Sequence, residues 1–288
     1  MHIVLGGTGH VGSALVETLL ARGEPVTLVT RDASKATAWR AKGAQVEQVD
    51  ILDTVALRRV FRRGRRAFLL NPPAEPSGDT DATERRTVSA ILAALEGSGL
   101  EKVVAQSTYG AQPGEGNGDL GSLYALEQGL AAQPIPATLQ RAAYYLSNWD
   151  AQLDMARQEG TLMSFFPADF SLPMVAPRDL GEAAADFLTE PVDRTGVRYV
   201  EGPRRYTSRE VADAMAAVVG RPVALQVVPR SEWQSTFERL GFSESAARSY
   251  ARMTAIVLDG DYEQPEAPRR GATAVRAYFE EVARRRSE

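Results

Sequence analysis

Glycines dominate a short segment near the start of the chain, LGGTGHVG, where Gly6, Gly7, Gly9 and Gly12 lie within seven residues. Glycine weakens regular structure, so this spacing indicates a tight turn, a close approach by another backbone, or a ligand that tolerates no Cβ. An apolar run precedes the segment and a helix-like pattern follows it, as in turns that bind dinucleotides. There the helix N–H groups would bind pyrophosphate. The alternative is a glycine-rich turn without a ligand.

The residues after the second apolar run indicate which nicotinamide cofactor would bind. In NAD-binding chains an acidic side chain at this strand end bonds the ribose hydroxyls. Here the segment reads VTRDASKA, with Arg31 directly after the strand and Lys35 one helical turn further on. Both cations can pair with the 2′-phosphate of NADP, whereas Asp32 lies one place later and could cap the next helix. We therefore expect NADP (as NADPH); the alternative is that Arg31 and Lys35 are solvated surface charges.

Further cofactor contacts are expected from the ends of the third and fourth strands. Asp50 could bond the adenine amine while Ile51 packs on the ring, or Asp50 could simply start a turn. Asn71, Pro72 and Pro73 would form the rim beside the riboses, because proline fixes an extended backbone. The full set of expected cofactor-binding residues is Gly6, Thr8, Gly9, His10, Val11, Gly12, Arg31, Lys35, Asp50, Ile51, Asn71, Pro72, Pro73, Ser107 and Tyr144.

A regular scaffold must position these residues, and the apolar pattern predicts one. Expected strands at 2–5, 25–30, 45–49, 67–70, 102–105 and 137–139 alternate with expected helices at 10–22, 34–42, 54–63, 83–96 and 120–131. This alternation predicts an α/β fold with a Rossmann-like, doubly wound parallel sheet. The rhythm changes near residue 143, so we expect a cofactor-binding domain over 1–142 and a smaller α/β substrate-binding lobe over 143–288. The helix at 177–190 could pack back on the first domain. Thr207 or Ser208, with Glu210, predicts a capping box.

The composition argues against several classes of protein. The chain has no cysteine and only two histidines, His2 and His10, so we expect no metal site and no Ser-His-Asp hydrolase. The net charge of −4 gives no reason to expect nucleic acid, and we read the arginine-rich segment RRVFRRGRR as a solvated helix face. Without a signal segment or a long apolar run, we expect a cytoplasmic protein away from membranes. The expected partner is a small-molecule substrate. A homodimer is also possible.

Several segments, in their order, resemble the NmrA-like branch of the atypical short-chain dehydrogenase/reductase family. They are IVLGGTGHVGSALVETLLARG, VTRDASKA, VDILD, VVAQSTYGA, PATLQRAAYYLSNW and APRDLGEAAADFL. The resemblance runs through nearly the whole chain. It implies a Rossmann-like sheet with a small substrate lobe and an active cleft between them. Members of this family include NADPH:quinone oxidoreductases, isoflavone-type reductases and catalytically silent redox sensors.

The chain departs from the wider family at its proton-transfer pair. Short-chain dehydrogenases use Tyr-x-x-x-Lys, in which the cation lowers the pKa of the tyrosine. Here the fourth residue after Tyr124 is Gln128, which carries no charge. The protein could therefore use an acceptor that needs little acid catalysis, draw the proton from another group, or perform no chemistry.

Other candidates follow the fifth and sixth strands. Ser107, Tyr109 and Tyr124 are the expected catalytic residues, because Ser107 and Tyr109 could hydrogen-bond a substrate oxygen. Tyr145, Asn148 and Phe166 are the expected substrate contacts, with core packing as the alternative for the aromatic rings. We expect an NADPH-dependent oxidoreductase that passes hydride to a quinone or another conjugated carbonyl. The alternatives are an NADP(H)-sensing regulator without activity and a non-redox isomerase or lyase on the same fold.

Overall fold

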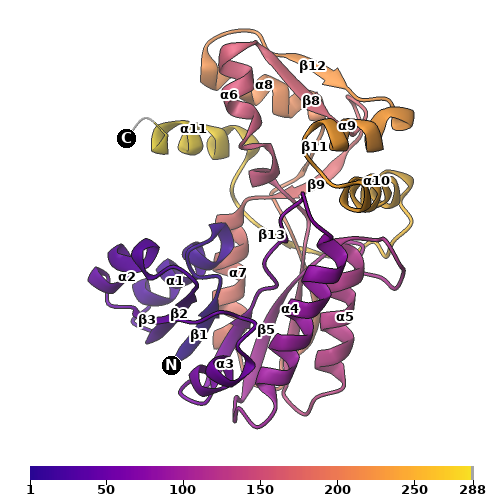
Figure 1. Cartoon of the computed structure of the whole chain (residues 1–288). Helices are drawn as coiled ribbons and strands as arrows, with labels where there is room; N and C mark the ends of the chain where they lie inside the picture. Colours follow the sequence, from indigo (N-terminus) through magenta and orange to yellow (C-terminus); the bar gives the residue numbers. More distant parts are fainter. Residues whose placement is uncertain (287–288) are drawn as a thin grey trace.

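A central parallel sheet of eight strands organises the computed structural model, which describes residues 1–286 (Figure 1). Its order is β13-β10-β6-β5-β4-β1-β2-β3, and every neighbouring pair is parallel. The strands are β1 (His2–Leu5), β2 (Val26–Thr30), β3 (Gln45–Gln48), β4 (Arg66–Leu69), β5 (Lys102–Thr108), β6 (Ala137–Ala142), β10 (Gly196–Glu201) and β13 (Arg269–Arg270). The expected Rossmann-like fold is confirmed, and the order reverses beside β1, where such sheets bind ligands.

Helices cover both faces of this sheet, and each face has its own apolar core. The helices on one face are α3 (Thr54–Phe61), α4 (Thr80–Leu95) and α5 (Asp119–Ala131), whose buried residues include Phe61, Ile91 and Leu126. Those on the other are α1 (His10–Ala21) and α7 (Pro177–Thr189), which bury Leu15, Leu19, Leu180 and Phe187. The segment after β2 forms a short 3₁₀ helix, η1 (Ala33–Ala36), followed by α2 (Thr37–Ala41).

Part of the sheet comes from beyond residue 142. Strand β10 pairs with β6, and β13 pairs with β10 at the sheet edge. Helix α7 packs so closely on α1 that a Cβ on Gly181 would lie 2.6 Å from the Ala14 Cβ and the Leu15 nitrogen. The chain thus leaves the sheet after β6 and returns to it. The sheet is therefore not confined to residues 1–142, because the edge of β6 and the apolar face of α1 both need covering.

The second lobe sits at the carboxyl edge of the sheet, where the strands of a parallel sheet end together. Its core gathers Trp149, Leu162, Met174, Met215 and Phe279. A capping box begins α8, with Thr207 and Glu210 bonding each other's backbone, as predicted. The elements are β7 (Tyr144–Tyr145), η2 (Leu146–Trp149), α6 (Gln152–Gln158), β8 (Thr161–Ser164), β9 (Leu172–Val175), β11 (Arg205–Tyr206), α8 (Ser208–Val219), β12 (Ala224–Val227), η3 (Arg230–Glu232), α9 (Trp233–Arg239), α10 (Glu244–Asp259) and α11 (Val275–Arg285).

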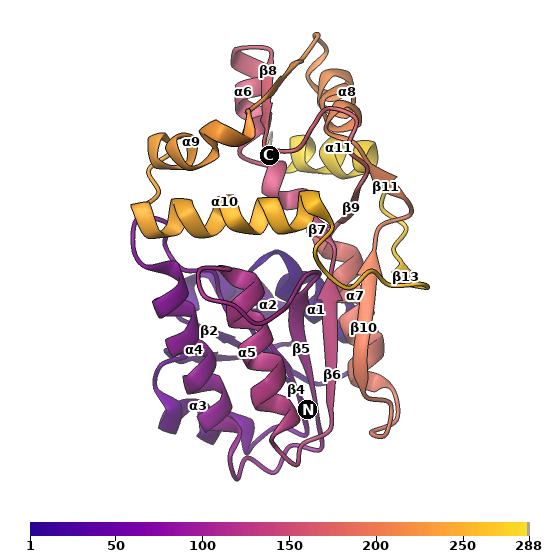
Figure 2. The same ribbon diagram turned by 90° about the vertical axis from the view of Figure 1, so that its right-hand side faces the viewer.

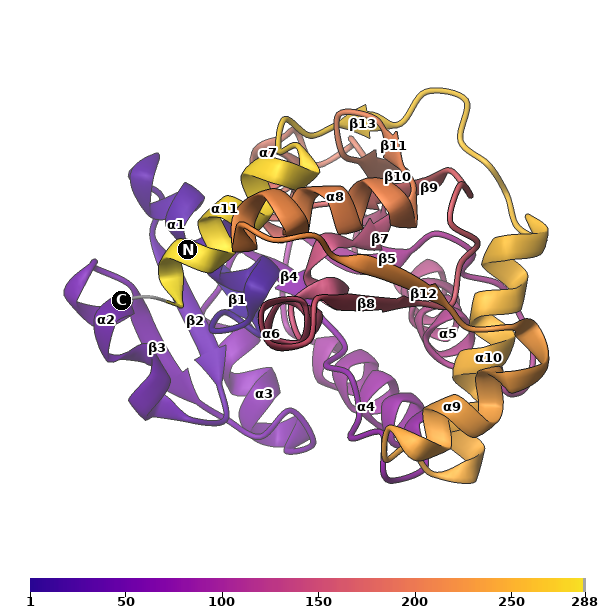
Figure 3. The same ribbon diagram turned by 90° about the horizontal axis from the view of Figure 1, so that it is seen from above.

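Two helices of this lobe approach the sheet from different sides. Helix α10 crosses above the starts of α4 and α5, as Figure 2 shows. Seen from above, α11 runs beside α8 and extends over the side of the molecule that holds α1 (Figure 3). Both helices therefore lie over the edge at which Rossmann-like sheets bind their ligands.

Arginines of the segment around α3 also bind within the fold, although Arg59, Arg62, Arg63 and Arg65 are exposed, as expected. The Arg62 guanidinium donates to the Gly97 carbonyl at 3.1 Å, beyond the end of α4. Arg66 donates to the carbonyls of Leu188 and Glu190 at the end of α7. Free carbonyls and negative potential gather at helix ends, so guanidinium groups stabilise them there. No helix within residues 1–286 is both long enough and apolar enough to cross a membrane.

Candidate functional site

The glycine-rich turn joins β1 to α1 and bends back on itself. Gly6 has φ +64°, which favours glycine, and the Gly9 N–H donates to the Gly6 carbonyl at 2.9 Å. Gly9 is the residue before α1, and no side chain caps that helix. The first N–H groups of α1 are therefore left for another acceptor.

Packing explains two of these glycines and leaves one unexplained. A Cβ on Gly12 would lie 2.2 Å from the Gly6 carbonyl oxygen, and a Cβ on Gly7 would lie 2.4 Å from the Leu28 side chain. A Cβ on Gly9 would meet only the Gly6 oxygen, at 3.3 Å, and Gly9 has φ −86°, which other residues adopt. Gly9 is also exposed. The space beside it suits a phosphate lying against the backbone, so the residues present fit a dinucleotide.

The residues after β2 include an acid that caps a helix and two exposed cations, one of which, Lys35, also acts on that acid. The Asp32 carboxylate accepts from the Ser34 N–H at 2.9 Å and caps η1. Hydrogen bonds from Ser34 lower the pKa of this carboxyl, which stays ionised for its capping role. The side chains of Arg31 and Lys35 are exposed. They can reach a phosphate at this strand end without breaking an interaction of the fold.

The ends of β3 and β4 also carry expected cofactor residues. The Asp50 carboxylate accepts from the Leu52 N–H at 3.0 Å and so forms a turn, while Ile51 packs against the core under α3. After β4, the Asn71 Oδ1 atom is buried without a hydrogen-bond partner. Such an atom is costly unless a ligand or water satisfies it. The adenine contact of Asp50 stays a prediction, and Asn71 supports a ligand at this edge.

A cleft of about 760 Å³ lies on the outer side of the glycine-rich turn. Thr8, Gly9 and His10 line it from the turn, and Arg178 lines it from the start of α7. Its far wall is α11, where the Tyr278 hydroxyl donates to the Asp150 carboxylate at 2.9 Å. Sequence reasoning did not foresee that α11 would reach this turn, because only the fold brings residues so far apart in the chain together.

The hydroxyls of Ser107 and Tyr109 already have partners within the fold. Ser107 donates to Glu127, which also forms a buried ion pair with Arg141 at 2.7 Å. Tyr109 donates to Glu201 at 3.0 Å, and burial together with the Glu201 charge raises its pKa far above the usual range. A role for either hydroxyl toward a substrate stays a prediction, and it would require these internal bonds to break.

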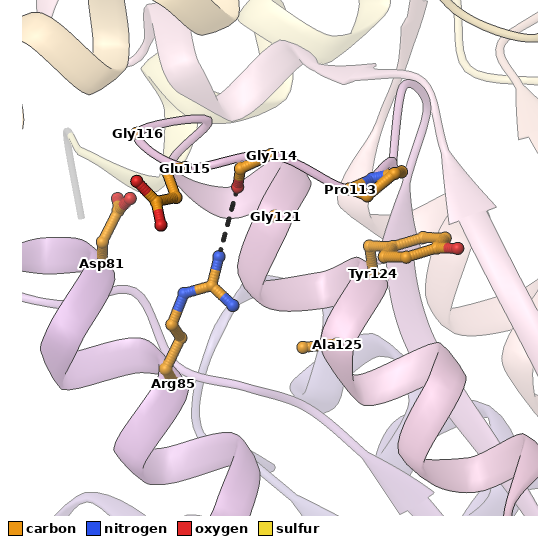
Figure 4. Close-up of a pocket in the computed structure, with 9 residues that line it drawn as sticks. All are labelled: Asp81, Arg85, Pro113, Gly114, Glu115, Gly116, Gly121, Tyr124 and Ala125. Carbon is orange, nitrogen blue, oxygen red and sulfur yellow. Dashed lines mark hydrogen bonds between the residues drawn. The ribbon is translucent and has the colours of Figure 1, made fainter.

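Tyr124 lies in a different environment from the other expected catalytic residues. It lines a surface pocket of about 480 Å³ between α4 and α5, with Asp81, Arg85 and the loop at 113–116 (Figure 4). Arg85 donates to the Gly114 carbonyl across this pocket, at 3.4 Å. The structure thus gives Tyr124 other neighbours than Ser107 and Tyr109, and its catalytic role stays a prediction.

Of the expected substrate residues, Asn148 and Phe166 meet Tyr144, whereas Tyr145 packs against the core beneath α1 and α7. The Tyr144 ring meets the Phe166 ring edge-on, with centroids 5.7 Å apart, and Phe166 stacks on Phe170. Burial raises the pKa of Tyr144 to about 12, although a hydrogen bond with Asn148 acts in the opposite direction. Burial and the Asp119 charge raise the pKa of Tyr145 further. The rings of Tyr144, Phe166 and Phe170 belong to the second core, so core packing accounts for them, and a contact with substrate stays a prediction.

A pair of carboxyl groups lies near Tyr145 that sequence reasoning missed. Glu84 of α4 is 3% exposed, accepts from the Ser122 hydroxyl at 2.8 Å and from the Ala74 N–H at 3.2 Å, and is hydrogen-bonded to Asp119 at the start of α5. Burial and the Asp119 charge raise the pKa of Glu84 to about 8. The only sequence signal was a glutamate on an otherwise buried helix face.

This pair makes stability depend on pH. Glu84 ionises near its ordinary pKa of 4.5 in the unfolded chain and near 8 in the folded one. Between these values the folded state binds more protons, so the free energy of unfolding falls as pH rises from about 5 to about 8. We expect the Glu84→Gln variant to show a flatter dependence in urea denaturation series across this range. Parallel curves for the two proteins would contradict the assignment.

Comparisons with known proteins agree with this geometry. The profile of the NmrA-like family matches residues 2–278. An NAD(P)H azoreductase of Xenophilus azovorans is 24% identical over 258 residues, which cover 89% of this chain and 87% of the azoreductase.

Two solved structures share the whole architecture. The Citrobacter sp. triphenylmethane reductase complexed with NADP(H) has a TM-score of 0.79 at 18% identity, over 98% of this chain and 100% of that one. An NADPH-dependent quinone oxidoreductase of Escherichia coli complexed with NADPH has a TM-score of 0.77 at 21% identity, over 100% of both chains. These matches confirm the resemblance seen in the sequence and the Rossmann-like fold.

Proposed function

This chain belongs to the NmrA-like family, and on that premise we propose that it is an NADPH-dependent oxidoreductase. The observation that carries the proposal is Gly9, an exposed glycine that packing does not require, at the start of an uncapped helix. Its N–H and those of α1 bind the pyrophosphate. The bound cofactor supplies hydride, and the protein orients it and excludes water.

Arg31 and Lys35 bind the 2′-phosphate of this cofactor. Both side chains are exposed after β2, while the neighbouring acid, Asp32, is committed to its cap. Asn71 Oδ1 accepts a hydrogen bond from a ribose hydroxyl, which satisfies an atom that otherwise lies buried without a partner. These assignments distribute the cofactor along the carboxyl ends of β1, β2 and β4.

The hydride acceptor is a quinone or another conjugated carbonyl compound. The rings of Tyr144, Phe166 and Phe170 lie together at the carboxyl edge, where they can stack against a flat acceptor. The relatives described above are named for azo, quinone and triphenylmethane compounds, which are also conjugated. The lobe over residues 143–288 contributes most of the contacts with the acceptor.

The oxidation of NADPH, followed by its absorbance, tests this function. We expect turnover with menadione, with an enone or with an azo dye, and no turnover when the acceptor is omitted. Tight NADPH binding without turnover on any of these acceptors would favour the NADP(H)-sensing regulator. Failure to bind NADPH would refute both roles.

Cofactor choice gives a separate prediction. The Arg31→Ala variant should bind NADPH about 10-fold or more weakly, since a charge-assisted bond to phosphate contributes about 1.5–3 kcal/mol. Its affinity for NADH should change little, because NADH lacks the 2′-phosphate. Fluorescence titrations with both cofactors measure the two effects, and Arg40→Ala, an exposed arginine on α2, is the matched control. Equal losses for both cofactors would refute the phosphate contact.

A further inference from the structure

The carboxyl pair Glu84–Asp119 lies at the edge of the sheet where the acceptor is proposed to bind. Helix α4 begins at Thr80 and α5 begins at Asp119, both after strands that end at this edge. Glu84 lies one turn into α4 and is buried, whereas Asp119 is half-buried at the start of its helix. Of the two carboxyl groups, Asp119 is therefore the outer one.

The contacts of the pair favour one shared proton. The two carboxyl groups are close enough for a hydrogen bond, which needs a proton on one of them because two ionised carboxylates have no donor. The Ser122 hydroxyl and the Ala74 N–H both donate to Glu84 and hold it in place. Asp81, one residue into α4 after Thr80, adds a further negative charge near Asp119 and raises the pKa of its carboxyl group. A shared proton is thus the way in which the pair avoids two adjacent negative charges.

A buried hydroxyl group without a hydrogen-bond partner lies on the same helix face as Glu84 and indicates a place for a ligand. The Thr80 side chain is 2% exposed, and its Oγ1 atom has no hydrogen-bond partner. Thr80 lies one helical turn before Glu84, so both side chains are on the same face of α4. The Asp119 charge raises the pKa of Tyr145, in β7, and of Tyr250, in α10. Neither tyrosine hydroxyl has a hydrogen bond to another described residue.

We propose that Asp119 is the proton donor of the reaction, with Glu84 as the positioning residue that shares this proton with it. The inference rests on the proposed function. The acceptor carbon gains hydride from reduced nicotinamide, and the electrons of its C=O bond move to the oxygen. That oxygen forms an O–H bond as the O–H bond of Asp119 breaks, and water later returns one proton to the pair. This donor takes the place of the Tyr-x-x-x-Lys pair of the wider family, whose lysine position is Gln128 here.

Two acceptors that differ in their need for a proton test this proposal. Menadione requires a hydride and a proton, whereas malachite green is a carbocation that becomes its neutral reduced form by gaining hydride alone. The Asp119→Asn variant should lose about 100-fold or more in kcat with menadione, since general acid catalysis contributes about 10²–10⁴-fold. Its turnover of malachite green should change little, which also demonstrates that the variant folds and binds NADPH. Glu84→Gln should show the same pattern. The side-chain amide of the new glutamine would donate a hydrogen bond to the Asp119 carboxylate, which stabilises the ionised form that has no proton to give.

The matched control is Glu115→Gln, which removes an exposed carboxylate from the loop preceding α5. It should leave both activities unchanged. Equal losses with both acceptors in Asp119→Asn would overturn the proposal, as would menadione turnover close to that of the unmodified protein. An unmodified protein that reduces neither acceptor would instead refute the proposed function.

A second measurement needs no cofactor and no turnover. Infrared spectra of the protein alone at pH 6.5 should contain the carbonyl stretch of a protonated, buried carboxyl group. This band should disappear in both Asp119→Asn and Glu84→Gln and persist in Glu115→Gln. Its absence from the unmodified protein, or its persistence in both variants of the pair, would overturn the shared proton.

Discussion

The Gly9→Val variant is expected to lose NADPH affinity by about 100-fold or more while keeping nearly all of its stability. Each tenfold loss corresponds to about 1.4 kcal/mol, and the valine side chain would occupy the space where pyrophosphate approaches the backbone. The fold tolerates the change because Gly9 is exposed, has φ −86°, and has only the Gly6 oxygen near its Cβ position. Fluorescence titration and thermal unfolding measure the two properties separately.

The matched control lies three residues further along the same turn. A Cβ on Gly12 would lie 2.2 Å from the Gly6 oxygen, so Gly12→Ala forces the turn and α1 apart. We expect this variant to lose about 1–3 kcal/mol of stability, as overpacked sites do. A Gly9→Val protein that binds NADPH normally, or that unfolds as readily as Gly12→Ala, would contradict the assignment of Gly9 to the cofactor.

The second large effect is expected at the buried ion pair of Glu127 and Arg141. Glu127 accepts from Arg141 Nε at 3.0 Å and from an Arg141 terminal nitrogen at 2.7 Å, and both side chains are less than 10% exposed. Glu127→Gln leaves the buried guanidinium with only the exposed carboxylate of Glu263, at 3.2 Å. We expect the free energy of unfolding to fall by about 3–5 kcal/mol, as when one partner of a buried pair is removed. Urea denaturation measures this loss.

The double variant Glu127→Leu/Arg141→Met separates the ion pair from simple packing. Replacing both charges by apolar side chains removes the desolvation cost as well as the attraction, so it is often neutral or stabilising. We expect the double variant to be more stable than Glu127→Gln. The single variants Glu127→Leu and Arg141→Met complete the comparison. If their losses in the free energy of unfolding add up to the loss of the double variant, as for independent sites, then the pair does not act as a unit.

Local patterns were sufficient to predict the scaffold of the cofactor site. The alternation of short apolar runs with amphipathic helices specified β1 to β6 and the helices between them, since each element is recognised within its own residues. The capping box of α8 and the glycine-rich turn are equally local, because both depend on spacings of three residues or so. The prediction that Asp32 caps a helix, and the hypothesis that Arg31 binds a 2′-phosphate, also depended only on the position of each residue directly after a strand.

Contacts between distant segments escaped the same reasoning. Strands β10 and β13 return to the sheet because the edge of β6 is otherwise uncovered. No local sequence pattern predicts this pairing. Ser107 and Tyr109 stand at strand ends where substrates bind, yet the fold brings Glu127 and Glu201 to their hydroxyls. The arginines of the segment at 58–66 looked like a solvated face, whereas Arg62 and Arg66 bind the carbonyls at helix ends.

By itself the amino-acid sequence determined the fold class, the glycine-rich turn and the basic character of the strand end beside it, because these follow from periodicity and from residues close together in the chain. Only the tertiary structure decided which polar groups are already paired and which are left for a ligand. It separated Gly9 from Gly12, tied Tyr109 to Glu201, and placed Asp119 against Glu84. The reason is that pairing and desolvation depend on neighbours from other elements, which packing alone brings into contact.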